Sequence, residues 1–216
     1  MRLTVRGVLF DMDGTLVDSN ALVEQIWTDF CQRYSLDPQQ VLAYSHGRIT
    51  ADTVNHFAPP EVDRTAEIKR LDDTELTAVD GIVEVPGAGH LLAQLPPESF
   101  AIVTSASINL MRVRMAAANV IVPSTLVCAG DCVNGKPAPD VYLRGAQLLA
   151  LEPQDCVVFE DSRAGIASGL AAGIPVVVVG NLDDPVTDDL PRIPDYTNVS
   201  VTIDHDAEGL LITFDL

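Results

Sequence analysis

The chain has 216 residues, of which 47% are hydrophobic, and its formal net charge at pH 7 is −18. This length suits one domain of moderate size, or a core domain that carries an insert. The negative charge repels nucleic-acid phosphates and anionic lipids, and no apolar run has the length of a bilayer span, so we expect neither nucleic acid nor membrane as a partner. The four cysteines have no metal-binding spacing, which favours reduced thiols in a cytoplasmic protein.

The first predicted strand is the apolar run Val5–Phe10, and two carboxylates follow it directly. Asp11 and Asp13 lie two positions apart, so an extended backbone places both side chains on the same side of the chain. Two like charges this close are unfavourable unless a cation lies between them. We therefore predict a site for a divalent metal and a phosphoryl group at the carboxyl end of this strand. The alternative interpretation is an ordinary turn or helix N-cap built from Asp and Gly.

Residues 17–84 are predicted to form an all-helical insert, because this segment has strong helical patterns and no convincing strand. Apolar residues recur at helical spacing in the first part, and Pro at the first helical position marks the next helix. The predicted helices are Ala21–Tyr34, one that opens at Asp37-Pro38, and Glu61–Ala78. The chain enters and leaves this insert near Val17 and Glu84, which we predict to be hinges.

Beyond the insert, short buried strands alternate with helices. The strands are rich in Val and Ile and lack polar alternation, as expected for parallel strands that helices cover on both faces. The predicted strands are Phe100–Thr104, Cys156–Phe159 and Pro175–Val179, and the predicted helices are Gly87–Leu95, Ile108–Asn119, Ala138–Leu149 and Ser162–Ala172. This order predicts a doubly wound, Rossmann-like α/β core formed by residues 1–16 and 85–216. Asn198–Ile203 and Leu210–Phe214 are predicted to form a C-terminal β-hairpin.

Polar residues also follow the later strands, and in open parallel sheets ligands bind at these carboxyl ends. The hydroxyl of Thr104 and the backbone N–H of Ser105 can hold a phosphate, although a helix N-cap would have the same sequence. Lys136 is one of only two lysines and lies between Gly and Pro, so its ammonium can be directed at an anion. Glu160 and Asp161 repeat the costly pairing of carboxylates and again require a cation.

Together these segments resemble the haloacid dehalogenase superfamily of phosphatases. The segments are Asp11-Met12-Asp13-Gly14-Thr15, Val103-Thr104-Ser105, Gly135-Lys136-Pro137 and Glu160-Asp161-Ser162-Arg163-Ala164-Gly165-Ile166. They span nearly the whole chain, and the helical insert resembles the helical cap of the branch that acts on small substrates. The resemblance implies a Mg²⁺-dependent hydrolysis of phosphate monoesters through an aspartyl-phosphate. The chemistry agrees, because a carboxylate attacks a phosphate only where charge is neutralised.

The resemblance also implies a role for each site residue. Asp11 would be the nucleophile, and Asp13 would protonate the leaving alkoxide and then deprotonate the attacking water. The groups that would hold the phosphoryl oxygens are Thr104, Lys136 and the backbone amides of Gly14 and Ser105. The metal ligands would be Asp161, the Asp11 carboxylate and the backbone carbonyl of Asp13, with weaker support from Glu160.

Substrate preference is expected to depend on the insert, where Ser45-His46-Gly47-Arg48 forms a cationic loop in an acidic protein. The loop resembles the His-Gly-basic stretch in the caps of polyol- and sugar-phosphate phosphatases. Arg48 can grip a phosphate or hydroxyls as a fork of donors, and His46 can bond to sugar hydroxyls. The alternative is a simple turn with exposed charge. We therefore expect a monomeric phosphatase whose partner is a small phosphorylated sugar or polyol.

Three other activities of the superfamily, and one non-catalytic function, are alternatives. Phosphomutases of this kind have a cap His where this chain has Val23, dehalogenases lack the second Asp, and phosphonate-cleaving relatives need a cap Lys. Lys69 is the only lysine in the insert, and its charged surroundings indicate solvated surface. A metal-binding or interaction module without catalysis is the alternative of another class.

Overall fold

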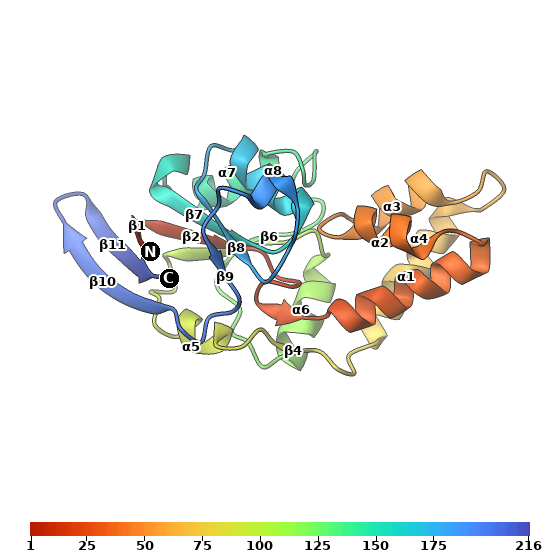
Figure 1. Ribbon diagram of the computed structural model, residues 1–216, viewed down its shortest axis with the longest axis horizontal. Coiled ribbons are helices and arrows are strands. Elements are labelled where there is room, and N and C mark those ends of the chain that lie inside the picture. Colours follow the sequence, from red (N-terminus) through yellow and green to blue (C-terminus); the bar gives the residue numbers. More distant parts are fainter.

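The computed structural model describes residues 1–216, with an α/β core on one side and four helices on the other (Figure 1). The core is built on a six-stranded parallel sheet in the order β6-β5-β2-β7-β8-β9. The strands are β6 (Thr125–Val127), β5 (Phe100–Val103), β2 (Gly7–Phe10), β7 (Cys156–Glu160), β8 (Val176–Val179) and β9 (Arg192–Ile193). The predicted class, a doubly wound parallel sheet, is confirmed. The short edge strands β6 and β9 were not predicted.

Helices cover both faces of this sheet, and alternate strand residues pack on opposite sides. Val8 and Phe10 belong to one apolar cluster, while Leu9 between them belongs to the other. The first cluster includes residues of α5 (Ala88–Leu92) and α6 (Ile108–Ala117), and the second includes residues of α7 (Asp140–Leu148) and α8 (Arg163–Ala171). Two short 3₁₀ turns, η1 (Pro153–Asp155) and η2 (Pro185–Thr187), lie in the connections. Burial on both faces explains why these strands lack polar alternation.

The predicted strand Val5–Phe10 is wrong in its extent, because two strands of different sheets occupy this segment. β1 (Arg2–Val5) pairs antiparallel with β11 (Gly209–Asp215), which also pairs with β10 (Ser200–Asp206), so the predicted hairpin gains a third strand. Between β1 and β2, the Arg6 guanidinium donates hydrogen bonds to Asp206 and Glu208, each at 2.8 Å. These contacts hold the chain where it passes from one sheet to the other. The two termini lie close together (Figure 1).

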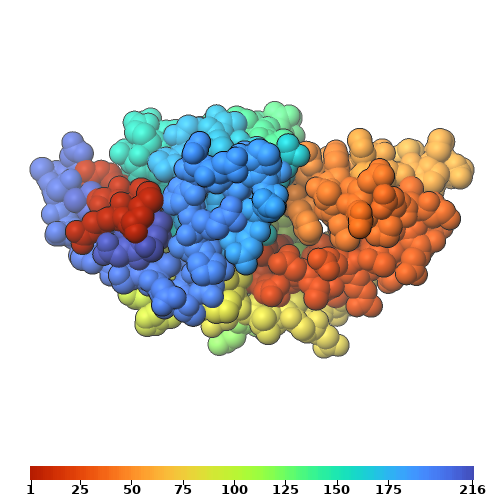
Figure 2. All heavy atoms as spheres, in the orientation of Figure 1, coloured from red at the N-terminus to blue at the C-terminus, as the bar shows by residue number.

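The four helices of the insert are α1 (Asn20–Tyr34), α2 (Pro38–Ser45), α3 (Thr50–Phe57) and α4 (Arg64–Thr77). Asp37 caps α2 by accepting a hydrogen bond from the Gln39 amide at 2.9 Å, with Pro38 in the first helical position. Residues from all four helices form a small apolar core of their own. Its buried members are Ile26, Trp27, Phe30, Cys31, Val41, Val54, Ala58 and Leu71. The insert is therefore a packed unit that adjoins the α/β core along one boundary (Figure 2).

The chain enters and leaves the insert through two adjacent strands. β3 (Val17–Asp18) pairs antiparallel with β4 (Val83–Glu84), and the amide of Val85 donates to the carbonyl of Leu16 at 2.9 Å. The expectation that this segment contains no strand was wrong here, because strands of two residues carry no readable pattern. None of the helices has the length and hydropathy that a bilayer span needs.

Candidate active site

The carboxyl ends of two neighbouring strands bring the acidic residues together, and a third strand adds a threonine. Asp11 follows β2, Glu160 ends β7, Asp161 follows it, and Thr104 follows β5 on the other side of β2. One carboxylate oxygen from each of Asp11, Glu160 and Asp161 lies within 4.8 Å of the others. Segments 150 residues apart in the sequence thus converge at one edge of the sheet, as the strand order requires.

Lys136 lies inside this acidic cluster. Its ammonium donates to Asp11 Oδ1 at 2.5 Å and to Glu160 Oε1 at 2.7 Å, and only 2% of the residue is exposed. Burial opposes the charged form, but attraction to Asp11 and Glu160 outweighs it and raises the pKa of Lys136. The lysine is therefore a fixed positive charge beside Asp11.

Glu160 is occupied mainly by protein donors. Its Oε1 accepts hydrogen bonds from Lys136 and from the Tyr142 hydroxyl at 3.0 Å, and its Oε2 accepts from the Ser162 amide at 2.8 Å and hydroxyl at 3.0 Å. A Cβ on Gly165 would overlap this carboxylate, so α8 can start this close only with Gly there. The main effect of Glu160 is to orient Lys136 and the start of α8.

The donor set fits a divalent cation. Burial raises the pKa of Asp11 and of Asp161, and the neighbouring Glu160 carboxylate raises both further. Lys136 supplies one positive charge against three carboxylates, so a second cation would favour ionisation of all three. Gly14 has φ +81°, and a Cβ there would overlap the Asp161 carboxylate, so Gly lets the backbone approach this site. Oxygen donors with room for water suit Mg²⁺.

Asp13 lies apart from this cluster and makes different contacts. Its Oδ1 accepts a hydrogen bond from the Ser19 hydroxyl at 2.6 Å, and its Oδ2 accepts one from Arg114 Nη1 at 2.6 Å. Arg114 Nη2 donates in turn to Glu75 Oε1 of α4 at 3.2 Å. Sequence reasoning missed Arg114 and Glu75, because each is a single charged residue within a helix and belongs to no recognisable motif.

Thr104 and Ser105 lie on the other side of Asp11. Thr104 is buried, and its hydroxyl accepts a hydrogen bond from the Ala106 amide at 3.0 Å, but the N-cap of α6 is Ser107, whose hydroxyl accepts from the Leu110 amide at 3.3 Å. The Ser105 hydroxyl donates to the carbonyl of Gly47 at 2.8 Å, which links the core to the insert. Both residues line the cavity described next.

A cavity of about 260 Å³ lies between the core and the insert. Asp11, Asp13 and Asp161 line it from the core side. Most of the insert residues that line the cavity are uncharged, and a few are charged. Among them are Val23, Trp27, His46, Arg48, Thr50 and Asp72. A volume of this size suits a small molecule.

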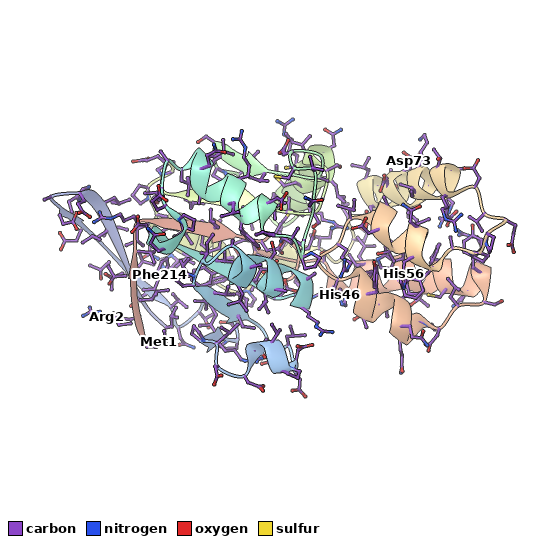
Figure 3. The ribbon with its side chains drawn as sticks, turned by 90° about the horizontal axis from the view of Figure 1, so that it is seen from above. Met1, Arg2, His46, His56, Asp73 and Phe214 are labelled. Carbon is purple, nitrogen blue, oxygen red and sulfur yellow. The ribbon has the colours of Figure 1, made fainter.

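The predicted loop His46-Gly47-Arg48 reaches the core from the insert. Figure 3 shows His46 at the boundary between the two parts. Gly47 has φ +75°, and a Cβ there would overlap the Ser162 hydroxyl. The Arg48 guanidinium lies over the Tyr44 ring, 4.4 Å from its centre. Burial lowers the pKa of His46, despite the opposing charge of Glu24, and so favours the neutral imidazole.

Two residues that bear on the alternatives are also placed. Val23 lines the cavity, at the position where phosphomutases of this kind have His. Lys69 pairs with Asp73 at 2.5 Å, and 74% of its side chain is exposed. It lines neither of the two main cavities, so it is not in place for Schiff-base chemistry.

Comparison with known proteins identifies relatives over most of the chain. Residues 8–179 match the family described as haloacid dehalogenase-like hydrolase. The chain is 42% identical to hexitol phosphatase A of Escherichia coli over 96% of this chain and 94% of the relative. It is 31% identical to 2-deoxyglucose-6-phosphate phosphatase 1 of Saccharomyces cerevisiae, over 94% and 93%. A hydrolase structure from Entamoeba histolytica superposes with a TM-score of 0.76 at 22% identity, covering 90% of this chain and 95% of the other.

Proposed function

The chain belongs to the haloacid dehalogenase-like hydrolase family, and we propose that it is a Mg²⁺-dependent phosphatase of hexitol phosphates and related sugar or polyol phosphates. The relatives that support this substrate class are a hexitol phosphatase and a deoxyglucose phosphate phosphatase. The observation that carries the proposal is the pairing of buried Lys136 with Asp11 beside Asp161, where Asp11 and Asp161 line a small cavity.

In this proposal Asp11 attacks phosphorus and forms an aspartyl-phosphate, and the alkoxide of the polyol leaves. Asp13 donates a proton to that alkoxide, then accepts a proton from the water that hydrolyses the aspartyl-phosphate. Lys136, the Thr104 hydroxyl and the amides of Gly14 and Ser105 hold the phosphoryl oxygens. Asp13 is suited to both proton transfers because it lines the cavity outside the acidic cluster.

The proposed Mg²⁺ ligands are the Asp11 and Asp161 carboxylates and the backbone carbonyl of Asp13, with Glu160 in support. When bound, the ion supplies positive charge that lets an anionic phosphate approach an anionic nucleophile. Glu160 also keeps Lys136 directed at Asp11 through its 2.7 Å hydrogen bond. The protein itself thereby provides a second, permanent cation beside the reacting carboxylate.

We propose that residues 17–84 act as a cap that closes over the core, with hinges near Val17 and Glu84. The contact of Ser105 with Gly47 and the close approach of Gly47 to Ser162 support a closed arrangement. Closure excludes water while the first step proceeds. His46 and Arg48 line the cavity from the cap side, and we propose that they bind the hydroxyls or phosphate of the substrate.

The test is release of inorganic phosphate from a hexitol phosphate, with Mg²⁺ and with EDTA. Asp11→Asn is expected to abolish release while leaving the thermal unfolding temperature close to that of the wild type. Asp204→Asn, an exposed acid on β10, is the matched control and should be fully active. Product analysis separates hydrolysis from phosphomutase activity, because a mutase returns an isomeric sugar phosphate. Substantial phosphate release by Asp11→Asn would exclude Asp11 as the nucleophile.

A further inference from the structure

A buried arginine joins the cap to the residue that we assign to proton transfer. Arg114 lies on α6 of the core and is 3% exposed. Its two terminal nitrogens contact carboxylates from different parts of the molecule, Asp13 after β2 and Glu75 on α4 of the cap. Removing a guanidinium from water is costly, and the two carboxylate contacts offset that cost.

Arg114 and Ser19 together bind both carboxylate oxygens of Asp13. Arg114 Nη1 donates to one carboxylate oxygen at 2.6 Å, and the Ser19 hydroxyl donates to the other at 2.6 Å. With both oxygens held, rotation of the carboxylate is restricted, and its orientation toward the cavity is fixed. Proton transfer needs a donor and acceptor within hydrogen-bond reach, so this orientation bears directly on the reaction.

The contact with Glu75 makes the orientation of Arg114, and through it that of Asp13, depend on the cap. Glu75 is a buried residue of α4, and its Oε1 accepts from Arg114 Nη2 at 3.2 Å. The third guanidinium nitrogen, Nε, is buried and has no hydrogen-bond partner, so the Asp13 and Glu75 contacts alone orient the group. If α4 moves away with the cap, the guanidinium loses one of its two carboxylate partners. The planar guanidinium of Arg114 binds two carboxylates through different nitrogens, and the single ammonium of a lysine cannot reproduce this geometry.

We propose that Arg114 is a positioning residue that orients Asp13 for proton transfer, and that Glu75 couples this orientation to closure of the cap. The inference rests on the proposed function, because it assumes that Asp13 transfers the protons. It adds a link between two events, since the acid would be aligned only when the cap lies over the substrate.

The leaving group provides the discriminating test. An alkoxide leaving group needs a proton from Asp13, whereas p-nitrophenolate leaves readily without one. Measured in a single turnover, which isolates the first step, Arg114→Met is expected to lower the rate with a hexitol phosphate by about 10- to 100-fold. With p-nitrophenyl phosphate the expected loss is below about threefold, because Asp11 and Lys136 are unchanged. Equal losses with both substrates would overturn the proposal.

A double-mutant cycle tests whether Arg114 acts through Asp13. In an Asp13→Asn background, Arg114→Met should lower the first-turnover rate with p-nitrophenyl phosphate or hexitol phosphate by less than about twofold. Losses that multiply would show that Arg114 acts independently of Asp13 and would overturn the proposal. The proposed function has a separate test, because Asp11→Asn inactivates the enzyme with both substrates whatever Arg114 does.

Glu75 and Arg112 supply the remaining variants. Glu75→Ala is expected to reduce the rate with hexitol phosphate by about 3- to 10-fold, and Glu75→Gln should restore most of it, because its amide oxygen still accepts from Arg114. Arg112→Met, an exposed residue on the same helix, is the matched control and should match the wild type. If Arg114→Met does not fold, Glu75→Ala still decides the question, since an equal loss with both substrates contradicts the coupling.

Discussion

Gly47 offers a direct test of cap closure, because its replacement by Ala acts on the closed state in particular. The residue has φ +75°, a conformation that costs a side chain-bearing residue about 1 kcal/mol. Its new Cβ would also overlap the Ser162 hydroxyl. Ser162 cannot easily move aside, because its hydroxyl donates to Glu160 at 3.0 Å and accepts from the Gly165 amide at 3.0 Å. The loop must therefore withdraw from the core.

Withdrawal also lengthens the 2.8 Å hydrogen bond between Ser105 and the Gly47 carbonyl. Loss of that bond costs about 1 kcal/mol, which corresponds to roughly a fivefold shift away from the closed state. The overlap with Ser162 adds to this. Because the proposed closure precedes the chemistry, kcat/KM for a hexitol phosphate is expected to fall by at least about fivefold in Gly47→Ala.

Gly173→Ala is the matched control. Gly173 has φ +73°, nearly the same backbone conformation, but a Cβ there meets nothing within 4 Å. The backbone conformation alone should cost each variant about 1 kcal/mol of unfolding free energy, or roughly 2–4 °C in thermal midpoint, and the loss of the Ser105 hydrogen bond should lower the stability of Gly47→Ala further. Only Gly47→Ala should lose activity. Steady-state phosphate release and thermal unfolding measure the two effects, and equal activity in the two variants would refute the role of this close approach.

Three further outcomes are expected. Mg²⁺ at about 100 times its Kd should stabilise the protein by about 2.7 kcal/mol in thermal unfolding; Asp161→Asn should abolish that shift, and an undiminished shift would place the ion elsewhere. The folded state holds the pKa of His46 below the ordinary value of 6.5, so the unfolded chain takes up a proton there more readily than the folded chain does. The free energy of unfolding of the wild type should therefore fall relative to that of His46→Gln as the pH falls below about 6.5. Parallel pH profiles from chemical denaturation would contradict this. Arg48→Ala should raise KM for a hexitol phosphate by about tenfold, the effect of losing a charged hydrogen bond, and leave p-nitrophenyl phosphate nearly unaffected; equal losses would argue against a role in specificity.

The fold was predictable where burial leaves a clear pattern. The runs before Asp11, Thr104 and Glu160 are buried on both faces, and their apolar composition places them in a parallel sheet. That placement also predicts which residues meet, since the ends of adjacent parallel strands share one edge. The cluster of Asp11, Glu160 and Asp161 follows from this topology, although the distances between the carboxylates do not.

The remaining features depend on contacts that the sequence does not display. Nothing in the apolar run Val5–Phe10 shows that Arg6 pairs with the C-terminal hairpin, or that the run is divided between two sheets at this residue. The bridge from Asp13 to Arg114 joins residues 101 positions apart, and the bridge from Arg114 to Glu75 joins residues 39 apart. A single arginine in a helix resembles any solvated arginine until the tertiary structure buries it. Buried charged residues of this kind escape motif-based reasoning for this reason.

The paired strands β3 and β4 bear on how enzymes of this construction can change their substrates. The chain leaves the α/β core after Leu16 and returns to it at Val85, and a 2.9 Å backbone hydrogen bond joins these two residues. An exchanged segment can begin and finish at this junction without changing the register of the parallel sheet, provided that it keeps a carboxylate partner for Arg114. Recombination at these two positions would therefore show directly whether substrate preference is carried by the exchanged insert.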